Sequence, residues 1–197
     1  MQLAKKVFKN VDNHLESSRF RNYVAVALRC KKTNEAFDFI ENYKQYLAEI
    51  PDRDDIIRYV SSLVLFQQKD YKKVIENLRF KQFSEEDFHL RSQIIFLKAW
   101  FELEESAHHK AGRHTEFDTL KRIEEFEKMV EKTETLSETV QQKFLLVAAA
   151  FRQIISVTET ARKTYASQAA KDACKTWLLS QNGLLERNWF LEKVREL

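Results

Sequence analysis

Hydrophobic residues recur every three or four positions along most of the chain, the spacing of a helix with one buried face. In residues 56–66 they include Ile56, Val60 and Val64, and a short polar turn, Lys69-Asp70-Tyr71, separates this segment from a second one. A third, more apolar segment follows at 88–104. The pattern predicts a helical hairpin and the first helix of the next hairpin, which together are the repeating unit of a helical solenoid.

The N-terminal part of the chain shows the same periodicity. It predicts an amphipathic helix over 3–15 and a second helix, capped by Ser17 and Ser18, that continues to about Cys30. A third helix is predicted to start at Thr33 and to include Leu47, and Pro51 stops it because proline cannot continue the hydrogen-bond ladder.

In the C-terminal half, residues 106–114 are polar and predict a loop between helices. Further helices are predicted over 117–130 and 140–158, and a last short one over 184–197. The polar face of this last helix is typical of the cap that closes a solenoid. Before this last helix, another helix is predicted that carries a stripe of packed side chains at four-residue spacing. A left-handed residue at Asn182-Gly183 ends this helix. The stripe consists of Tyr165, Ala169, Ala173 and Trp177.

Composition supports an all-α fold and a cytoplasmic protein. The 197 residues include only 2 Gly and 1 Pro, too few for the turns of a sheet-rich protein. No apolar run approaches the roughly 20 residues that span a bilayer, and residues 1–13 lack the apolar region of an export signal. Cys30 and Cys174 are far apart in sequence, which favours reduced thiols over a disulfide framework. We therefore expect no membrane association.

The hairpin pattern repeats along the chain. Thr33-x-x-Ala36-x-x-x-Ile40 aligns with Tyr71-x-x-Val74-x-x-x-Leu78, 38 residues further on, close to the ~34 residues of a tetratricopeptide unit. A weaker third register begins at Phe117. The drifting period predicts degenerate repeats in a single domain over residues 1–197, which can also be the C-terminal part of a longer array.

Three stretches, LVLFQQKDYKKVIENL, SQIIFLKAWFELEE and RNWFLEKVREL, resemble an uncharacterised group of bacterial tetratricopeptide-like (TPR-like) proteins. Members of that group share a Lys-Asp-Tyr turn, a Lys-x-x-Tyr-Tyr-Glu-Leu-type helix end and a Trp-Leu-Leu-Glu-Lys-type finish. Here the second element departs to the run from Lys98 to Leu103, and the third to the run from Trp189 to Lys193. The resemblance covers roughly residues 56–197 and implies a helical-repeat fold. Together with the helix pattern, it leads us to predict a TPR-like, right-handed superhelix of about four α-α hairpins with a C-terminal capping helix. The resemblance implies no reaction.

A TPR-like array would present a concave groove lined by the first helix of each hairpin, suited to a peptide or a partner helix. The predicted function is therefore a non-enzymatic scaffold or adaptor that binds a protein partner. Polar or aromatic residues that interrupt the lining helices are the groove candidates: Arg58, Ser61, Arg91, Lys98 and Trp100.

Basic residues gather near the N-terminus, where residues 1–35 hold eight of them against three acidic residues, a net charge of +5. They are Lys5, Lys6, Lys9, Arg19, Arg21, Arg29, Lys31 and Lys32. Such a patch can contact phosphates, so the alternative function is a regulatory module that contacts nucleic acid or a nucleic-acid-bound complex. A solvated helix face explains the charge as well, and the absence of a known nucleic-acid-binding motif disfavours this alternative.

No pattern of catalytic or cofactor-binding residues is recognisable. The sequence lacks a Gly-rich phosphate loop, a nucleophile elbow and a CxxC pair, so neither catalysis nor a cofactor is expected. His108, His109 and His114 form the only histidine cluster, and Glu116 or Asp118 could complete a metal site with them. Without the spacing of a metal-binding helix, a solvated loop is the favoured interpretation, and no metal is predicted.

Overall fold

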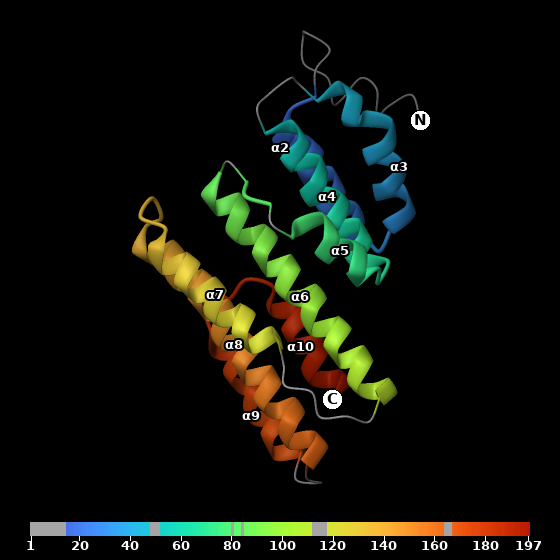
Figure 1. The fold of residues 1–197 in the computed structure, drawn as a ribbon. Coiled ribbons are helices and arrows are strands. Elements are labelled where there is room, and N and C mark those ends of the chain that lie inside the picture. Colours follow the sequence, from blue (N-terminus) through green and yellow to red (C-terminus); the bar gives the residue numbers. More distant parts are fainter. Residues whose placement is uncertain (1–14, 48–51, 80, 84, 112–117, 164–166) are drawn as a thin grey trace. The chain divides into compact units, whose positions relative to one another are not determined.

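A computed structural model of the chain describes residues 15–47, 52–79, 81–83, 85–111, 118–163 and 167–197 (Figure 1). In these ranges all regular secondary structure is helical, and no strand is formed. The predicted all-α fold is therefore confirmed. The predicted helix over 3–15 lies outside the described residues except for Leu15, and so does Pro51.

The chain divides into two compact units, Met1–His114 and Thr115–Leu197. The helices of the first unit are α2 (Ser17–Arg29), α3 (Thr33–Tyr43), the 3₁₀ helix η1 (Lys44–Tyr46), α4 (Arg53–Gln67), α5 (Tyr71–Leu78) and α6 (Glu86–Ala111). Those of the second unit are α7 (Asp118–Lys132), α8 (Glu138–Lys163), α9 (Ser167–Ser180) and α10 (Arg187–Glu196). A single domain over residues 1–197 stays a prediction.

Helix α4 is the centre of the first unit and packs against α2, α3, α5 and α6. Its apolar residues occur on more than one face, so between Asp55 and Phe66 none of its residues is exposed. The buried core around it also draws on the neighbouring helices and includes Phe20, Val24, Phe39, Ile40, Val60, Val64, Val74, Leu78, Leu90 and Ile94.

The predicted polar turn between the two helices of the central hairpin is confirmed. Helix α4 ends at Gln67, and Lys69 takes a left-handed conformation with φ of 61°. Asp70 then caps α5 by accepting a hydrogen bond from the backbone N–H of Lys73 at 3.4 Å. The Lys73 side chain, which also bonds this carboxylate, lowers the pKa of Asp70 below its ordinary value. One aspartate therefore both ends the turn and begins the helix.

The start of α2 differs from the prediction. Ser17 and Ser18 lie inside the helix rather than capping it, and the N-cap residue is Glu16, whose side chain makes no capping bond. Glu16 instead forms an ion pair with Arg19, one turn along, at 3.1 Å. A serine pair is a capping signal only when the chain turns at that point, and here the helix begins at Ser17 itself.

Helix α3 also ends earlier than predicted. The α-helix stops at Tyr43 and tightens into η1, and Leu47 is extended, so the prediction that the helix includes Leu47 is wrong. The backbone N–H of Leu15 donates to the carbonyl of Tyr46 at 2.7 Å, and Leu15 pairs with Leu47 in a parallel bridge. This pairing needs an extended strand-like residue, which is incompatible with a helix that continues to Leu47.

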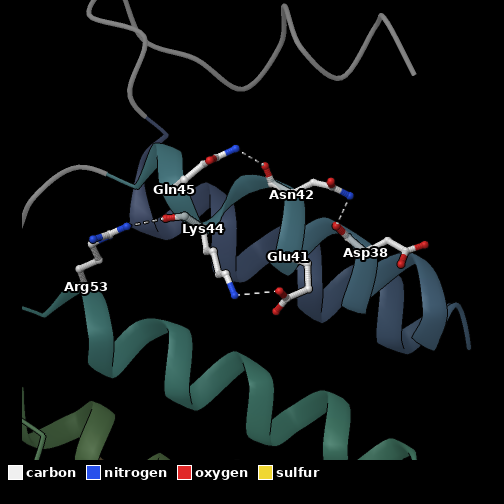
Figure 2. Close-up of polar contacts among 6 residues, drawn as sticks. All are labelled: Asp38, Glu41, Asn42, Lys44, Gln45 and Arg53. Atoms are coloured by element: carbon white, nitrogen blue, oxygen red, sulfur yellow. Dashed lines mark hydrogen bonds and ion pairs between the residues drawn. The ribbon is translucent and has the colours of Figure 1, made fainter.

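Side chains satisfy the backbone at the end of α3, as Figure 2 shows. Asn42 donates to the carbonyl of Asp38 at 2.7 Å, and Gln45 donates to that of Asn42 at 3.3 Å. Arg53, at the start of α4, reaches back to the carbonyl of Lys44 at 3.3 Å. The last carbonyls of a helix lack partners within the helix, so these bonds stabilise its end and tie it to α4.

Two helices are longer than predicted. Helix α6 continues to Ala111 instead of Glu104, and α8 continues to Lys163 instead of Thr158. The predicted loop over 106–114 is therefore wrong for its first six residues. At its start, the hydroxyl of Ser106 donates to the carbonyl of Glu102 at 2.8 Å, within the helix. Alanine, histidine and lysine are compatible with a helix, and residues 105–111 contain no glycine or proline.

In the second unit, α8 packs against α7, α9 and α10, and α9 also contacts α10. The core includes Ile123, Phe126, Val130, Phe144, Val147, Phe151, Ile154, Cys174, Leu178, Trp189, Phe190 and Val194. Arg152 on α8 forms two hydrogen bonds to the carboxylate of Glu127 on α7, at 3.2 and 2.7 Å. This bidentate pair fixes the two helices in register.

The predicted stripe on α9 is displaced by one residue. Ala169 and Ala173 are exposed, whereas Cys174 and Leu178 are buried, and Tyr165 lies outside the described residues. Burial raises the pKa of the Cys174 thiol. Alanine is common on both buried and exposed faces, so it locates the buried stripe less well than leucine or cysteine.

The link between α9 and α10 depends on the left-handed conformation of Gly183, with φ of +85°. Replacing Gly183 with alanine is expected to lower the free energy of unfolding by about 1 kcal/mol, because a side chain at positive φ is strained. Asparagine, which tolerates this conformation, should cost less. Thermal unfolding of both variants tests the expectation, and an alanine variant as stable as wild type would contradict it.

Candidate functional site

The five residues predicted to line a groove lie on two packed helices of the first unit. Arg58 and Ser61 lie on α4, and Arg91, Lys98 and Trp100 lie on α6. The two helices contact each other, and Lys98 reaches Phe66 on α4. Whether a partner can contact each side chain depends on how exposed that side chain is and on what it contacts within the protein.

On α4, Arg58 is half-buried and donates from Nη1 to the backbone carbonyl of Asn77 on α5 at 3.2 Å. Ser61 is half-buried as well. The next residue, Ser62, is buried and donates to the carbonyl of Arg58 at 2.9 Å. The hydrogen bond of Arg58 therefore joins α4 to α5, the two helices of one hairpin.

Of the three candidates on α6, only Arg91 is exposed, and its side chain pairs with Asp87 at 2.7 Å. Lys98 is 7% exposed, with its ammonium 4.6 Å from the centre of the Phe66 ring on α4. Trp100 is half-buried and meets Phe96 edge to face, with 6.3 Å between ring centres. A partner-binding role for the five residues stays a prediction.

The basic patch is only partly described, because Lys5, Lys6 and Lys9 lie outside the described residues. Lys32 pairs with Glu35 at 2.9 Å, which raises the pKa of Lys32, and Arg19 pairs with Glu16. Arg29 and Lys31 are exposed near the end of α2. Arg21 differs from all of these because it is half-buried and contacts another helix.

Arg21 belongs to a group of side chains that we call the Arg21 cluster: Arg21, Tyr59, Phe83, Phe88 and His89. The guanidinium carbon of Arg21 lies 5.3 Å from the centre of the Phe88 ring. Phe88 also meets Tyr59 at 4.5 Å and Phe83, edge to face, at 5.2 Å. A guanidinium over an aromatic face is a favourable cation–π contact.

The Arg21 cluster joins three helices that are not consecutive in the chain. Arg21 lies on α2, Tyr59 on α4 and Phe88 on α6. Arg21 and Phe88 lie close to the first residues of their helices, and Tyr59 lies in the first half of α4. Side chains from the N-terminal halves of α2, α4 and α6 therefore meet in this cluster, hereafter the α2–α4–α6 face, where Phe88 is buried and Arg21 and Tyr59 are half-buried.

His89 completes the cluster beside the link from α5 to α6. Its ring lies 6.1 Å from that of Phe83, and its Nδ1 accepts a hydrogen bond from the backbone N–H of Phe83 at 3.5 Å. Burial lowers the pKa of His89 below its ordinary value. Only the neutral imidazole offers a nitrogen lone pair to this N–H.

Acidification is expected to destabilise the first unit through His89. Because the folded-state pKa lies below the unfolded value of about 6.5, the unfolded chain binds the proton more readily. The contribution is therefore present above about pH 6.5 and is lost as the pH falls below it. Replacing His89 with glutamine, which does not titrate, should flatten the fall in urea midpoint between pH 7.5 and 5.5. An unchanged slope would contradict the expectation.

The sequence patterns did not identify Tyr59, Phe83 or Phe88 as parts of a site, and Arg21 was one of eight basic residues. Arg21 and Phe88 stand 67 residues apart, so no local spacing connects them. The only available signal was the recurrence of aromatic residues near the starts of successive predicted helices. That signal is equally typical of packed cores.

The described residues contain no group of three or more His, Cys, Asp or Glu side chains that could hold a metal ion. His108 and His109 fall within α6, and His114 and Glu116 lie outside the described residues, so the histidine cluster stays untested. None of the described helices is long and apolar enough to cross a membrane.

No protein-family model, curated protein or solved structure matches the chain. The resemblance to the bacterial TPR-like group stays an expectation.

Proposed function

We propose that the protein is a non-enzymatic scaffold or adaptor, built as a TPR-like, right-handed array of helical hairpins, that binds a peptide or partner helix on the α2–α4–α6 face. The array supplies a rigid surface, and the partner supplies a segment that lies across several helices.

The order of helix contacts supports a repeat array. In the first unit each α-helix packs against the next, and α4 also packs against α2 and α6, which are separated from it by one α-helix in the chain. In the second unit α8 packs against α10 in the same way. A solenoid of helical hairpins needs this alternation, because the first helices of successive hairpins form one layer and the second helices another.

The observation that carries the proposal is the contact between Arg21 and Phe88 beside Tyr59. In the proposed array, α2, α4 and α6 are the first helices of three successive hairpins, the helices that line the concave layer. Side chains from the two outer helices meet at the central one, as expected on the inside of a curved layer. Arginine and tyrosine are also the residue types most enriched among binding hot spots.

A peptide-display selection with the full chain tests the proposal. Random 16-residue peptides would be selected for binding, and the amide exchange of the protein would be compared with and without the best one. We expect slower exchange in α2, α4 and α6. Protection confined to α3 and α5, to α7–α10, or no selected peptide at all would overturn the proposal. The same peptide with its sequence scrambled is the matched control.

A further inference from the structure

Arg21 carries a charge that no described carboxylate balances. Its contact with the Phe88 ring is its only interaction among the described residues, and the side chain is half-buried. Partial burial removes hydrating water from the arginine, and the contact with an aromatic face offsets only part of the free energy lost. The cation–π contact leaves the five N–H donors of the guanidinium available for hydrogen bonds.

Two acidic side chains that lie near the other cluster members in sequence pair with cations other than Arg21. On α4, Asp55 is mostly buried and pairs with Lys81 at 3.0 Å. On α6, Asp87 pairs with Arg91 at 2.7 Å. Neither carboxylate forms an ion pair with Arg21, so the charge at the α2–α4–α6 face is left for a group from outside.

We infer that Arg21 binds a carboxylate of the partner, and that the partner segment is an acidic peptide. The inference rests on the proposed function and specifies the class of its ligand. An aspartate or glutamate side chain would accept hydrogen bonds from the guanidinium of Arg21, and apolar atoms of the same segment would pack beside Tyr59. A guanidinium held against a ring is preorganised, so less side-chain entropy is lost when it binds a carboxylate.

An acidic peptide fits better than nucleic acid because three of the other described cations near this end of the chain are paired with carboxylates, and two further exposed ones, Arg29 and Lys31, lie at or just beyond the far end of α2. Glu16 pairs with Arg19, Glu35 with Lys32, and Glu41 with Lys44. A phosphate backbone is bound by a continuous row of cations. A half-buried arginine against the Phe88 ring, set apart from Arg29 and Lys31, instead suits a single carboxylate within a peptide.

The test begins with the sequences of the selected peptides and measures their binding by fluorescence anisotropy. We expect Asp and Glu to be enriched over the unselected library. Arg21→Glu should weaken the best peptide at least about tenfold, because a charge-assisted hydrogen bond is lost and repulsion replaces it. Arg29→Glu, the same change at an exposed position of the same helix, is the matched control and should change binding less than about twofold. A peptide with its acidic residue changed to lysine should recover affinity for Arg21→Glu.

The outcomes separate this inference from the proposed function. Peptides that protect the α2–α4–α6 face but bind Arg21→Glu as tightly as wild type would overturn the acidic ligand and leave the proposed function standing. Tighter binding of a labelled single-stranded 20-nucleotide DNA than of any peptide, lost in Arg21→Glu, would overturn it in favour of nucleic acid. Arg21→Gln, with circular dichroism of each variant, shows whether lost affinity reflects the charge: a folded Arg21→Gln that binds like wild type would also overturn the inference.

Discussion

Replacing Phe151 with alanine is expected to lower the free energy of unfolding of the second unit by about 3 to 5 kcal/mol. Phe151 is 0% exposed, and its ring meets Trp189 at 5.5 Å and Phe190 at 5.0 Å. The substitution removes a large apolar side chain and leaves a cavity between α8 and α10. The surrounding helices can close this cavity only in part, because each also packs against α9.

Native-state hydrogen exchange of α8 amides measures this loss for the second unit alone, which matters because two compact units need not unfold in one transition. Leu179→Ala is the matched control: that side chain on α9 is 51% exposed, and its loss should cost no more than about 0.5 kcal/mol. A loss below about 1 kcal/mol for Phe151→Ala would show that α10 does not seal the core. The prediction that α10 caps the array would then lose its physical basis.

The elements that could be predicted from the sequence are those whose buried face is marked by large apolar residues. Ile56, Val60 and Val64 recur at the helical spacing, and all three are buried on α4. The same holds for Ile123, Phe126 and Val130 on α7. Burial of such side chains is the main favourable term in the free energy of folding, so their spacing indicates which face of each helix is buried.

The sequence mispredicts helix ends and buried faces where its hydrophobic pattern is weak or where tertiary contacts determine the structure. Ala169 and Ala173 were assigned to a buried stripe that runs instead through Cys174 and Leu178. The polarity of residues 106–111 suggested a loop, although a helix can be polar on all sides near its end. Helix α3 ends at Tyr43 because the following residues pair with a distant segment, which local spacing cannot reveal.

The candidate site was harder to predict than the fold, because polarity does not show where a side chain lies. The charge of Lys98 within an apolar helix predicts a groove residue, yet its ammonium lies against the Phe66 ring. Arg21 was one basic residue in a patch of eight, and its distinction is the contact with Phe88, 67 residues away. Such a contact depends on the packing of three helices and leaves no mark in local sequence.

Replacing Lys98 with glutamate is expected to lower the free energy of unfolding by about 3 to 5 kcal/mol, as large a loss as in the core. The ammonium lies 4.6 Å from the centre of the Phe66 ring, and the whole residue is only 7% exposed. The face of an aromatic ring carries negative charge, so a carboxylate there meets repulsion as well as the cost of burial. Lys98→Met, which keeps the unbranched aliphatic chain without the charge, should cost at most about 2 kcal/mol.

Urea unfolding followed by circular dichroism measures both Lys98 variants, with Arg91→Glu as the control on the same helix. Arg91 is exposed and pairs with Asp87 one turn away, so its reversal should cost no more than about 1 kcal/mol. A Lys98→Glu variant as stable as Arg91→Glu would mean that the Lys98 side chain can turn to solvent, which would restore it as a candidate partner contact. If the loss is as large as expected, reduced binding by Lys98→Glu would reflect unfolding. Substitutions of Arg21 then test binding at the α2–α4–α6 face without unfolding the protein.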